Sequence, residues 1–398
     1  MTINSAGLLL IGAYAIFLLA AAGTVRDKNT AASFFVNKRG GSAWSVALSI
    51  IVSCVGASAT LGVIGKAFAV GTPAFWWLGA GAAGLGVLAL FLAQKVRDSG
   101  AYTLPQMVEA FLGKATRPLI SLVIVVAWMA ILAAQFSALE RILESMTGLR
   151  PGLCLALAFA LIVVHSSGGQ AVIMRLDRLQ SFLLAGGLVM VMAWLWARNP
   201  AWHQSVRLEV VNEAFRPPDL FYYLFVVGGN YLVCPMLFGR LFSARDSAAA
   251  RRGGIYATAG LAACSALIVC IGLACVGLIP AETPQDAVLA KALVTLLPDW
   301  LRLLVFLALV SAVVSSADTC LVTAATVLSF DLLRRDSTLA CRSCVAGLGL
   351  AGLALSLMDK SILGFLLMAY DVYVCGVVVP VFIGLVCAKR RVVRQSFA

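Results

Sequence analysis

Charged residues are scarce in this chain of 398 residues: Asp, Glu, Lys and Arg make up 12% of it, against roughly 25% in an average soluble domain. Hydrophobic residues make up 62%, and the mean hydropathy is +0.98. A water-soluble fold could not cover so much apolar surface. The composition therefore predicts an all-α integral membrane protein whose solvent is lipid.

Histidine is also rare, since only His165 and His203 occur, which argues against a zinc or haem centre. Nearly all of the eleven cysteines lie in apolar runs, where a thiol packs as a small apolar side chain. Cys341 and Cys344 form a C-x-x-C, but no second Cys or His pair completes a metal site. Serine hydrolase and P-loop motifs are absent, and the polar loops lack the clustered His, Asp or Cys of a membrane enzyme. No enzyme activity and no cofactor is predicted.

Long apolar runs recur from end to end, each long enough to cross a hydrocarbon core about 30 Å thick. Eleven spans are predicted near residues 6–24, 43–69, 73–94, 117–143, 151–167, 178–196, 219–239, 254–279, 301–333, 340–358 and 361–387. The first run has no Lys or Arg before it and basic residues after it, so we expect a retained helix and not a signal peptide.

The distribution of basic residues predicts the orientation of these spans. With the N-terminus outside and the C-terminus inside, 21 of the 30 Lys and Arg residues fall in cytoplasmic segments, Arg240 among them, and 9 fall elsewhere. Acidic Glu282, Asp286 and Asp299 fall in an external loop. The net charge of +12 is thus explained by topology and anionic lipid headgroups, and no nucleic-acid partner is expected.

Two halves of five spans each, 43–196 and 219–387, follow an extra N-terminal segment, 1–42. An odd number of spans per half makes the halves inverted repeats, which place solute and ion sites near the midplane, where the first helix of each half is interrupted. The predicted breaks are marked by Ser53, Gly56, Ser58, Thr60 and Gly62 in one half. In the other half they are marked by Gly228, Gly229, Asn230 and Pro235.

The span 301–333 carries an unusually polar flank. Its polar and small residues recur at helical spacing: Ser311, Ala312, Ser315, Ser316, Asp318, Thr319 and Thr323. A carboxylate inside a membrane costs several kcal/mol and is functional by default. An unwound turn frees carbonyl oxygens, which a hard cation prefers as ligands, so these hydroxyls and the first break together predict an ion site.

Five segments resemble the sodium:solute symporter family, which includes the proline, pantothenate and sodium/glucose transporters. They are "TAASFFVNKRGGSAWSVALSIIVSCVGASATLGVIGKAF", "YTLPQMVEAFLG", "GGQAVIMRLDRLQSF", "GRLFSARDSAAARRG" and, most specifically, "ALVSAVVSSADTCLVTAATVLSFDLLRR". The resemblance implies a LeuT-type fold of five plus five core helices behind one extra N-terminal helix, with sodium as the coupling ion. Many members carry further helices after the tenth core helix, where this chain ends, so oligomer contacts are expected to differ.

The resemblance also implies the site residues. The family's principal sodium site maps to main-chain oxygens at Val52, Val55 and Ala312 and to the hydroxyls of Ser315 and Ser316. An acidic residue beneath it maps to Asp177, between Arg175 and Arg178, where an ion pair or a sodium exit is expected. A second ion would join Asp177, Ser315, Asp318 and Thr319. The implied solute site comprises Gly56, Ser58, Thr60, Gln135, Asn230, Tyr231, Tyr370 and Asp371.

Asp371 lies at midplane depth by residue count, where it could accept a substrate amine, carry a proton, or pair with a hydroxyl or an Arg. The family's sugar carriers have a polar pair that falls here on Ser58 and Ala59, which argues against a sugar. The function predicted is sodium-coupled symport of a small polar solute (an amino acid, a carboxylate or a vitamin-like molecule) across a plasma membrane, such as the bacterial inner membrane. Proton coupling on the same fold and a receptor built on a transporter scaffold remain the alternatives.

Overall fold

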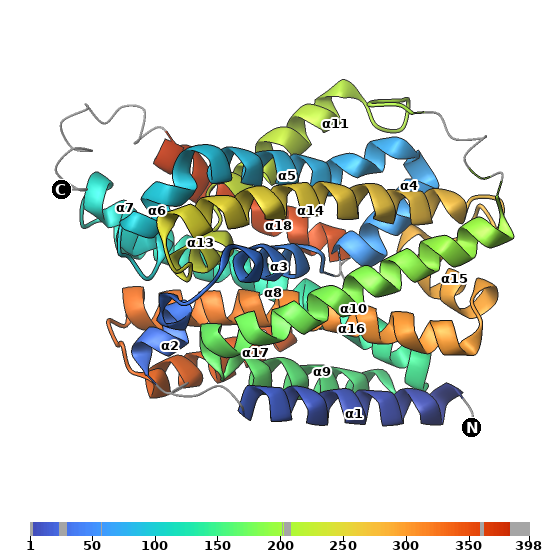
Figure 1. Cartoon of the computed structure of the whole chain (residues 1–398), viewed down its shortest axis with the longest axis horizontal. Helices are drawn as coiled ribbons and strands as arrows, with labels where there is room; N and C mark the ends of the chain where they lie inside the picture. Colours follow the sequence, from blue (N-terminus) through green and yellow to red (C-terminus); the bar gives the residue numbers. More distant parts are fainter. Residues whose placement is uncertain are drawn as a thin grey trace.

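The computed structural model describes residues 3–23, 30–56, 58–200, 202, 208–358 and 362–382. This part of the chain consists of helices joined by loops, and no β-strand occurs in it. Most of the long helices run side by side along the longest axis of the molecule (Figure 1). The prediction of an all-α architecture is confirmed.

The helices up to Arg198 include the extra N-terminal helix and the first predicted half. They are α1 (Ile3–Gly23), α2 (Ala31–Val36), α3 (Ala43–Cys54), α4 (Val63–Val70), α5 (Trp76–Val87), α6 (Ala93–Asp98), α7 (Leu104–Leu112), α8 (Thr116–Thr147), α9 (Pro151–Ser166) and α10 (Gly169–Arg198). Short helical turns adjoin them: η1 (Asn37–Arg39), η2 (Ser58–Gly62), η3 (Thr72–Phe75) and η4 (Leu88–Leu92).

The helices after the polar loop form the second predicted half. They are α11 (Pro217–Tyr222), α12 (Gly228–Leu232), α13 (Pro235–Phe242), α14 (Ser247–Ala274), α15 (Val288–Leu296), α16 (Asp299–Thr326), α17 (Thr338–Ser356) and α18 (Ile362–Tyr373). The turns of this half are η6 (Tyr223–Val227), η7 (Gln285–Ala287), η8 (Val327–Leu332) and η9 (Val374–Val378).

Capping residues explain where several helices begin and end. The Ser42 hydroxyl accepts the amide of Ser45 at the start of α3, and a carboxylate oxygen of Asp246 accepts the amide of Ala249 at the start of α14. Both caps satisfy one of the amides that a first turn leaves unpaired. α8 ends at Gly148, whose φ of 67° is a left-handed conformation that glycine adopts without strain.

The described residues contain seven helices that are long and apolar enough to cross a membrane. The helices Ala43–Cys54 and Ser58–Val70 form one further, bent span, and three shorter apolar helices are Ser5–Ala20, Pro151–Ser166 and Leu366–Phe382. Each of the eleven predicted spans falls on one of these helices. The molecule is therefore a multi-pass membrane protein, while the count of eleven and the orientation stay predictions.

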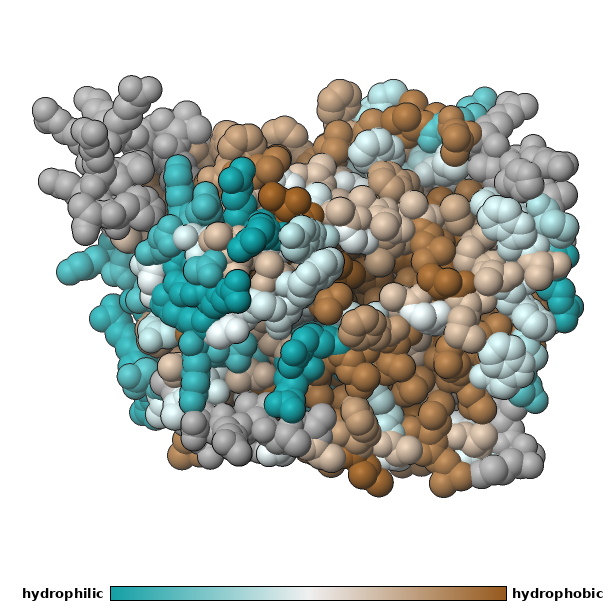
Figure 2. Space-filling view, in the orientation of Figure 1, coloured by the Kyte–Doolittle hydropathy of each residue, from teal (hydrophilic) through white to brown (hydrophobic). Residues whose placement is uncertain are grey.

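α16 is the central helix of the bundle, because 94% of its most apolar 18-residue stretch is buried, against 28% for α17. It contacts α8, α10 and α3. In Figure 2, hydrophilic residues gather toward the two ends of the molecule, and hydrophobic residues cover much of the surface between them. Five polar residues in the middle of α16 are buried among these helices: Ser311, Ser315, Ser316, Asp318 and Thr319.

Candidate ion and solute site

The first helix of the first half is broken beside the centre of α16. α3 ends at Cys54, Val55 has a non-helical ψ of 61°, and the chain resumes as η2 and α4 at an angle of 59° to α3. The last carbonyls of a helix have no partner within that helix, and Val52 and Val55 lie at this end of α3. Both residues are fully buried. The predicted break in this helix is confirmed.

Two hydroxyls of α16 contact this region from the other side. Ser316 Oγ donates to the carbonyl oxygen of Ser53 over 2.8 Å, and Ser315 Oγ donates to Asp177 Oδ1 over 2.6 Å. A Cβ at Gly56 would lie 2.3 Å from Ser316 Oγ, so only glycine permits this approach of the broken segment to α16. The end of α3 therefore contacts α16 through the Ser53 carbonyl and Ser316, while the neighbouring Ser315 contacts α10.

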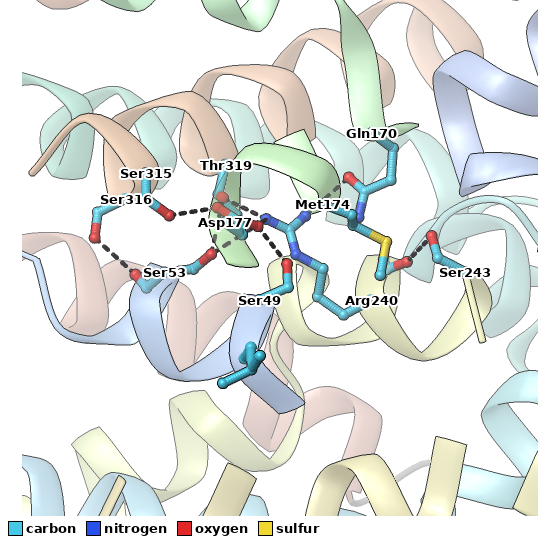
Figure 3. Close-up of polar contacts among 12 residues, drawn as sticks. Ser49, Ser53, Gln170, Met174, Asp177, Arg240, Ser243, Ser315, Ser316 and Thr319 are labelled. Atoms are coloured by element: carbon cyan, nitrogen blue, oxygen red, sulfur yellow. Dashed lines mark hydrogen bonds and ion pairs between the residues drawn. The ribbon is translucent and has the colours of Figure 1, made fainter. Parts of the chain in front are cut away.

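A buried ion pair lies next to these hydroxyls (Figure 3). Arg240, on α13, is 1% exposed, and its Nη2 lies 3.3 Å from Oδ2 of Asp177, on α10. Its Nη1 donates to Gln170 Oε1 over 2.8 Å, and the hydroxyl of Ser49 donates to Asp177. Each charge is thus paired and hydrogen-bonded, as burial in a membrane protein requires.

Sequence reasoning missed Arg240. It assigned this arginine to a cytoplasmic segment and placed Asp177 beside Arg175 and Arg178, but both of those side chains are exposed. The available signal was the position of Arg240 inside the apolar run "PMLFGRLF", whose proline begins α13. The expected ion pair of Asp177 exists, but its partner comes from the other half of the chain.

Asp318 and Thr319 face different sides of α16. Thr319 Oγ1 accepts a hydrogen bond from Arg240 and lies 3.0 Å from Ser53 Oγ, so it belongs to the cluster around Asp177. Asp318 is turned toward α9, where Ser166 Oγ donates to Oδ1 over 3.1 Å and His165 Nδ1 lies 3.6 Å from Oδ2. The four residues expected to join around a second ion therefore fall into two separate groups.

A small cavity lies on the other side of the break. Its lining includes six of the eight predicted solute residues: Gly56, Ser58, Gln135, Asn230, Tyr231 and Tyr370. The side chain of Ser316 also lines it, which places the hydroxyls of α16 and the cavity next to each other. Its free space is about 40 Å³, enough for a few water molecules or an ion and far below the roughly 300 Å³ of a small-molecule pocket. In this conformation the cavity is therefore too small for an organic solute.

The other two predicted solute residues do not line this cavity. Thr60 Oγ1 donates to the carbonyl oxygen of Gly56 over 3.0 Å, so its hydroxyl stabilises the broken segment itself. Asp371 is exposed on the outer surface of α18 and accepts a hydrogen bond from Tyr222 Oη over 2.7 Å. Of the three roles expected for Asp371, pairing with a hydroxyl is the one that its contact fits.

Two buried polar atoms of the cavity lining have no hydrogen-bond partner: Trp128 Nε1 and Asn230 Oδ1. Their residues are 1% and 3% exposed. An unpaired buried donor or acceptor costs free energy, so each is a natural contact for a bound solute. Trp128 was not predicted, because nothing in the sequence distinguishes a tryptophan that faces a cavity from one in an apolar core.

The second break is displaced from its predicted position. Gly228 and Gly229 are helical, and the helical path is interrupted at Val233 and Cys234, just before Pro235. A Cβ at Gly84 would lie 2.0 Å from the carbonyl oxygen of Gly228, and a Cβ at Gly228 would lie 3.1 Å from the carbonyl oxygen of Ala80, so both glycines allow α12 to lie close against α5. The proline marks the break correctly, and the glycine is a packing residue.

A sequence model of the sodium:solute symporter family matches residues 34–338. Comparison with curated protein sequences gives no match.

Among solved structures, one similar chain is a Na⁺-coupled sialic acid symporter in a substrate-bound, outward-open state. It is 16% identical, has a TM-score of 0.78, and the match covers 95% of this chain and 87% of that one. MhsT in complex with L-phenylalanine is also 16% identical, with a TM-score of 0.57 over 96% of this chain and 91% of that one. Likeness at this identity establishes the fold, so the predicted LeuT-type fold is confirmed.

Proposed function

Because the chain belongs to the sodium:solute symporter family, we propose that it is a secondary active transporter that uses a sodium gradient to carry a small polar organic solute across the plasma membrane. The solute is an amino acid, a carboxylate or a vitamin-like molecule. Sodium and solute are both cargo in this reaction, and the membrane lipid is the protein's solvent.

The observation that carries this proposal is the contact between the end of α3 and α16. Ser316 Oγ lies 2.8 Å from the carbonyl oxygen of Ser53, and Ser316 also lines the cavity. Oxygen atoms of both kinds, hydroxyl and main-chain carbonyl, are what a hard cation such as sodium prefers. An ion bound here would touch the wall of the solute cavity, which is the geometry that coupling requires.

We assign the sodium ligands to the main-chain oxygens of Val52, Val55 and Ala312 and to the hydroxyl oxygens of Ser315 and Ser316. The side chains of Val and Ala have no donor atom, so only the broken helix makes these positions useful to a cation. Both serine hydroxyls donate their protons elsewhere, to Asp177 and to Ser53. Their lone pairs are therefore free to face an ion.

In the proposed sodium site, Asp177 and Arg240 lie on the side of Ser315 toward which sodium is released. The carboxylate lies directly behind Ser315, and the guanidinium neutralises it. A sodium ion that leaves toward Asp177 meets a positive charge unless Arg240 moves aside. Release of sodium would then require the Asp177–Arg240 contact to lengthen, which makes this pair an exit gate and not a permanent ligand.

The cavity is the proposed solute site. Trp128 offers an N–H donor and Asn230 a carbonyl acceptor, and none of the described residues of the lining is Lys, Arg, Asp or Glu. Since its free space of about 40 Å³ is too small for an organic solute, the helices around it must separate before the solute enters. Alternating access would supply that change.

Solute uptake into proteoliposomes tests the proposal. Sodium and pH gradients are imposed separately, with a panel of amino acids, carboxylates and vitamins as solutes. We expect uptake that follows the sodium gradient for at least one class. Uptake that follows only the pH gradient would replace this proposal with the proton-coupled alternative, and solute binding without flux would favour the receptor.

A further inference from the structure

A groove with a volume of about 450 Å³ runs along the outer surface between η8 and the first half of α17. The lining residues that α17 and its cap contribute include a set that recurs every three or four positions and shares one side of the helix: Ser337, Ala340, Ser343, Cys344 and Gly347. A Cβ added at Gly347 would meet no atom within 4 Å. The groove is therefore hollow because small residues predominate on this side of α17.

The groove is charged at one end and mostly apolar along the rest. Arg335 lies where the chain turns from α16 into α17, and it is the only charged residue of the described lining. Its amide donates to the carbonyl oxygen of Ser329 over 2.8 Å, and the Ser329 hydroxyl donates to the Arg335 carbonyl oxygen over 2.7 Å, so the backbone is held in place. Its exposed guanidinium has no hydrogen bond or ion pair with another described residue. The walls contain four leucines: Leu328, Leu333, Leu339 and Leu348.

The length of the groove matches one leaflet of a bilayer. Gly347 follows Ser337 by ten residues, or roughly 15 Å along the helix, and a hydrocarbon core is about 30 Å thick. The turn between α16 and α17 lies at the same end of the molecule as α6 and α7 (Figure 1), the end that is predicted to face the cytoplasm. Arg335 therefore lies near the membrane surface, and the apolar part of the groove extends toward the middle of the core.

We propose that this groove binds one anionic phospholipid of the cytoplasmic leaflet, with its phosphate at Arg335 and an acyl chain along α17. A guanidinium at the headgroup level pairs well with a phosphate, and basic pockets between helices at this level suit anionic headgroups. Ser337 Oγ accepts the amide of Ala340, so its own proton remains available to a phosphate oxygen. Asp336 is exposed in the same turn but does not line the groove, and with Arg334 and Arg335 the turn keeps a positive charge that disfavours a headgroup ammonium.

Native mass spectrometry of the protein released from vesicles tests this proposal. The vesicles contain equal amounts of phosphatidylcholine and phosphatidylglycerol. We expect the wild-type chain to retain one phosphatidylglycerol molecule, and Arg335→Gln to lower its affinity for that lipid about fivefold, the effect of one basic residue at the headgroup level. Arg251→Gln is the matched control, because Arg251 is exposed near the start of α14 and does not line the groove. It should retain the lipid as the wild type does.

A second pair of variants tests the apolar part of the groove. Gly347→Leu places a side chain in the space for the acyl chain and should reduce retention of phosphatidylglycerol. Gly186→Leu on α10 is its control, since a Cβ there also meets no atom within 4 Å. Equal retention of the two lipids by the wild type, equal effects of Arg335→Gln and Arg251→Gln, or retention unchanged by Gly347→Leu would overturn the proposal. A mass of two chains that Gly347→Leu abolishes would replace the lipid with a second copy. None of these results depends on which solute or ion is transported.

Discussion

Ser315 and Ser316 are consecutive on α16, yet their hydroxyls serve different helices. Ser315 Oγ donates to Asp177 on α10 over 2.6 Å, and Ser316 Oγ donates to the end of α3 over 2.8 Å. Substitution of Ser315 should therefore affect the Asp177–Arg240 ion pair. Substitution of Ser316 should affect the contact between α16 and the end of α3, next to the cavity.

Ser316→Ala should raise the sodium concentration at half-maximal uptake. A hydrogen bond or ligand contact to a charged group is worth about 1.5–3 kcal/mol, so the expected increase is about tenfold or more. Ser137→Ala is the matched control, since the Ser137 hydroxyl is buried and donates to the Ala133 carbonyl of its own helix. Sodium titration of uptake in proteoliposomes measures both variants. An unchanged sodium response in Ser316→Ala would remove Ser316 from the ligand set.

Asp177→Ala should slow turnover more than it weakens external solute binding, because the proposed role of this carboxylate lies in sodium release. The substitution also leaves the Arg240 guanidinium buried without its counter-ion, which costs about 3–5 kcal/mol of stability. The double variant Asp177→Asn/Arg240→Gln should recover much of that loss. Thermal unfolding of the purified protein reports stability, and uptake at low sodium reports function. Wild-type transport by Asp177→Ala at low sodium would contradict the role in release.

Gly56→Ala should impair transport through sterics, because the added Cβ would lie 2.3 Å from Ser316 Oγ. Forcing apart a well-packed contact of this kind costs about 1–3 kcal/mol. Gly12→Ala is the matched control, since an added Cβ there meets no atom within 4 Å. Uptake rate and sodium affinity should both fall in the first variant and stay unchanged in the second. Normal sodium affinity in Gly56→Ala would mean that the break tolerates a wider separation from α16.

Trp128→Phe should weaken solute affinity while the sodium dependence keeps its form. The substitution removes the unpaired N–H of a residue that lines the cavity and retains most of the ring. Trp194→Phe is a suitable comparison, because the Trp194 indole donates to the carbonyl oxygen of Leu296, away from the cavity. Competition assays across the solute panel would measure the change. Equal effects of the two substitutions would argue against a direct contact with solute.

The orientation predicted from the basic residues is tested by labelling. Arg251, exposed near the start of α14, should lie on the cytoplasmic face. Arg251→Cys in a background with Cys375 replaced should resist a membrane-impermeant maleimide added to intact cells, and it should react after permeabilisation. Lys28→Cys, in a segment outside the described residues, should behave in the same way. Labelling of either position from outside would reverse the topology.

The sequence by itself determined the class of protein and the helix that carries the hydroxyls. Scarce charge and recurring apolar runs require a helical membrane bundle, because lipid offers no partner for an unpaired backbone group. Proline and small residues located the interrupted helices. The helical spacing placed Ser315 and Asp318 on one face of α16 and Ser316 and Thr319 on the adjacent face. These features depend only on residues close together in the sequence and on the lipid around the protein, so they can be predicted from the sequence.

Only the tertiary structure decided which of these groups meet. Arg240 and Asp177 are 63 residues apart in the chain, and their contact depends on how α13 lies against α10. The same packing turned Asp318 toward His165, put Trp128 into the cavity wall and left Asp371 on the exposed side of its helix. Helical spacing orders side chains around one axis, but it does not specify the rotation of that axis against its neighbours. That rotation follows from close packing across the whole bundle, which no single segment contains.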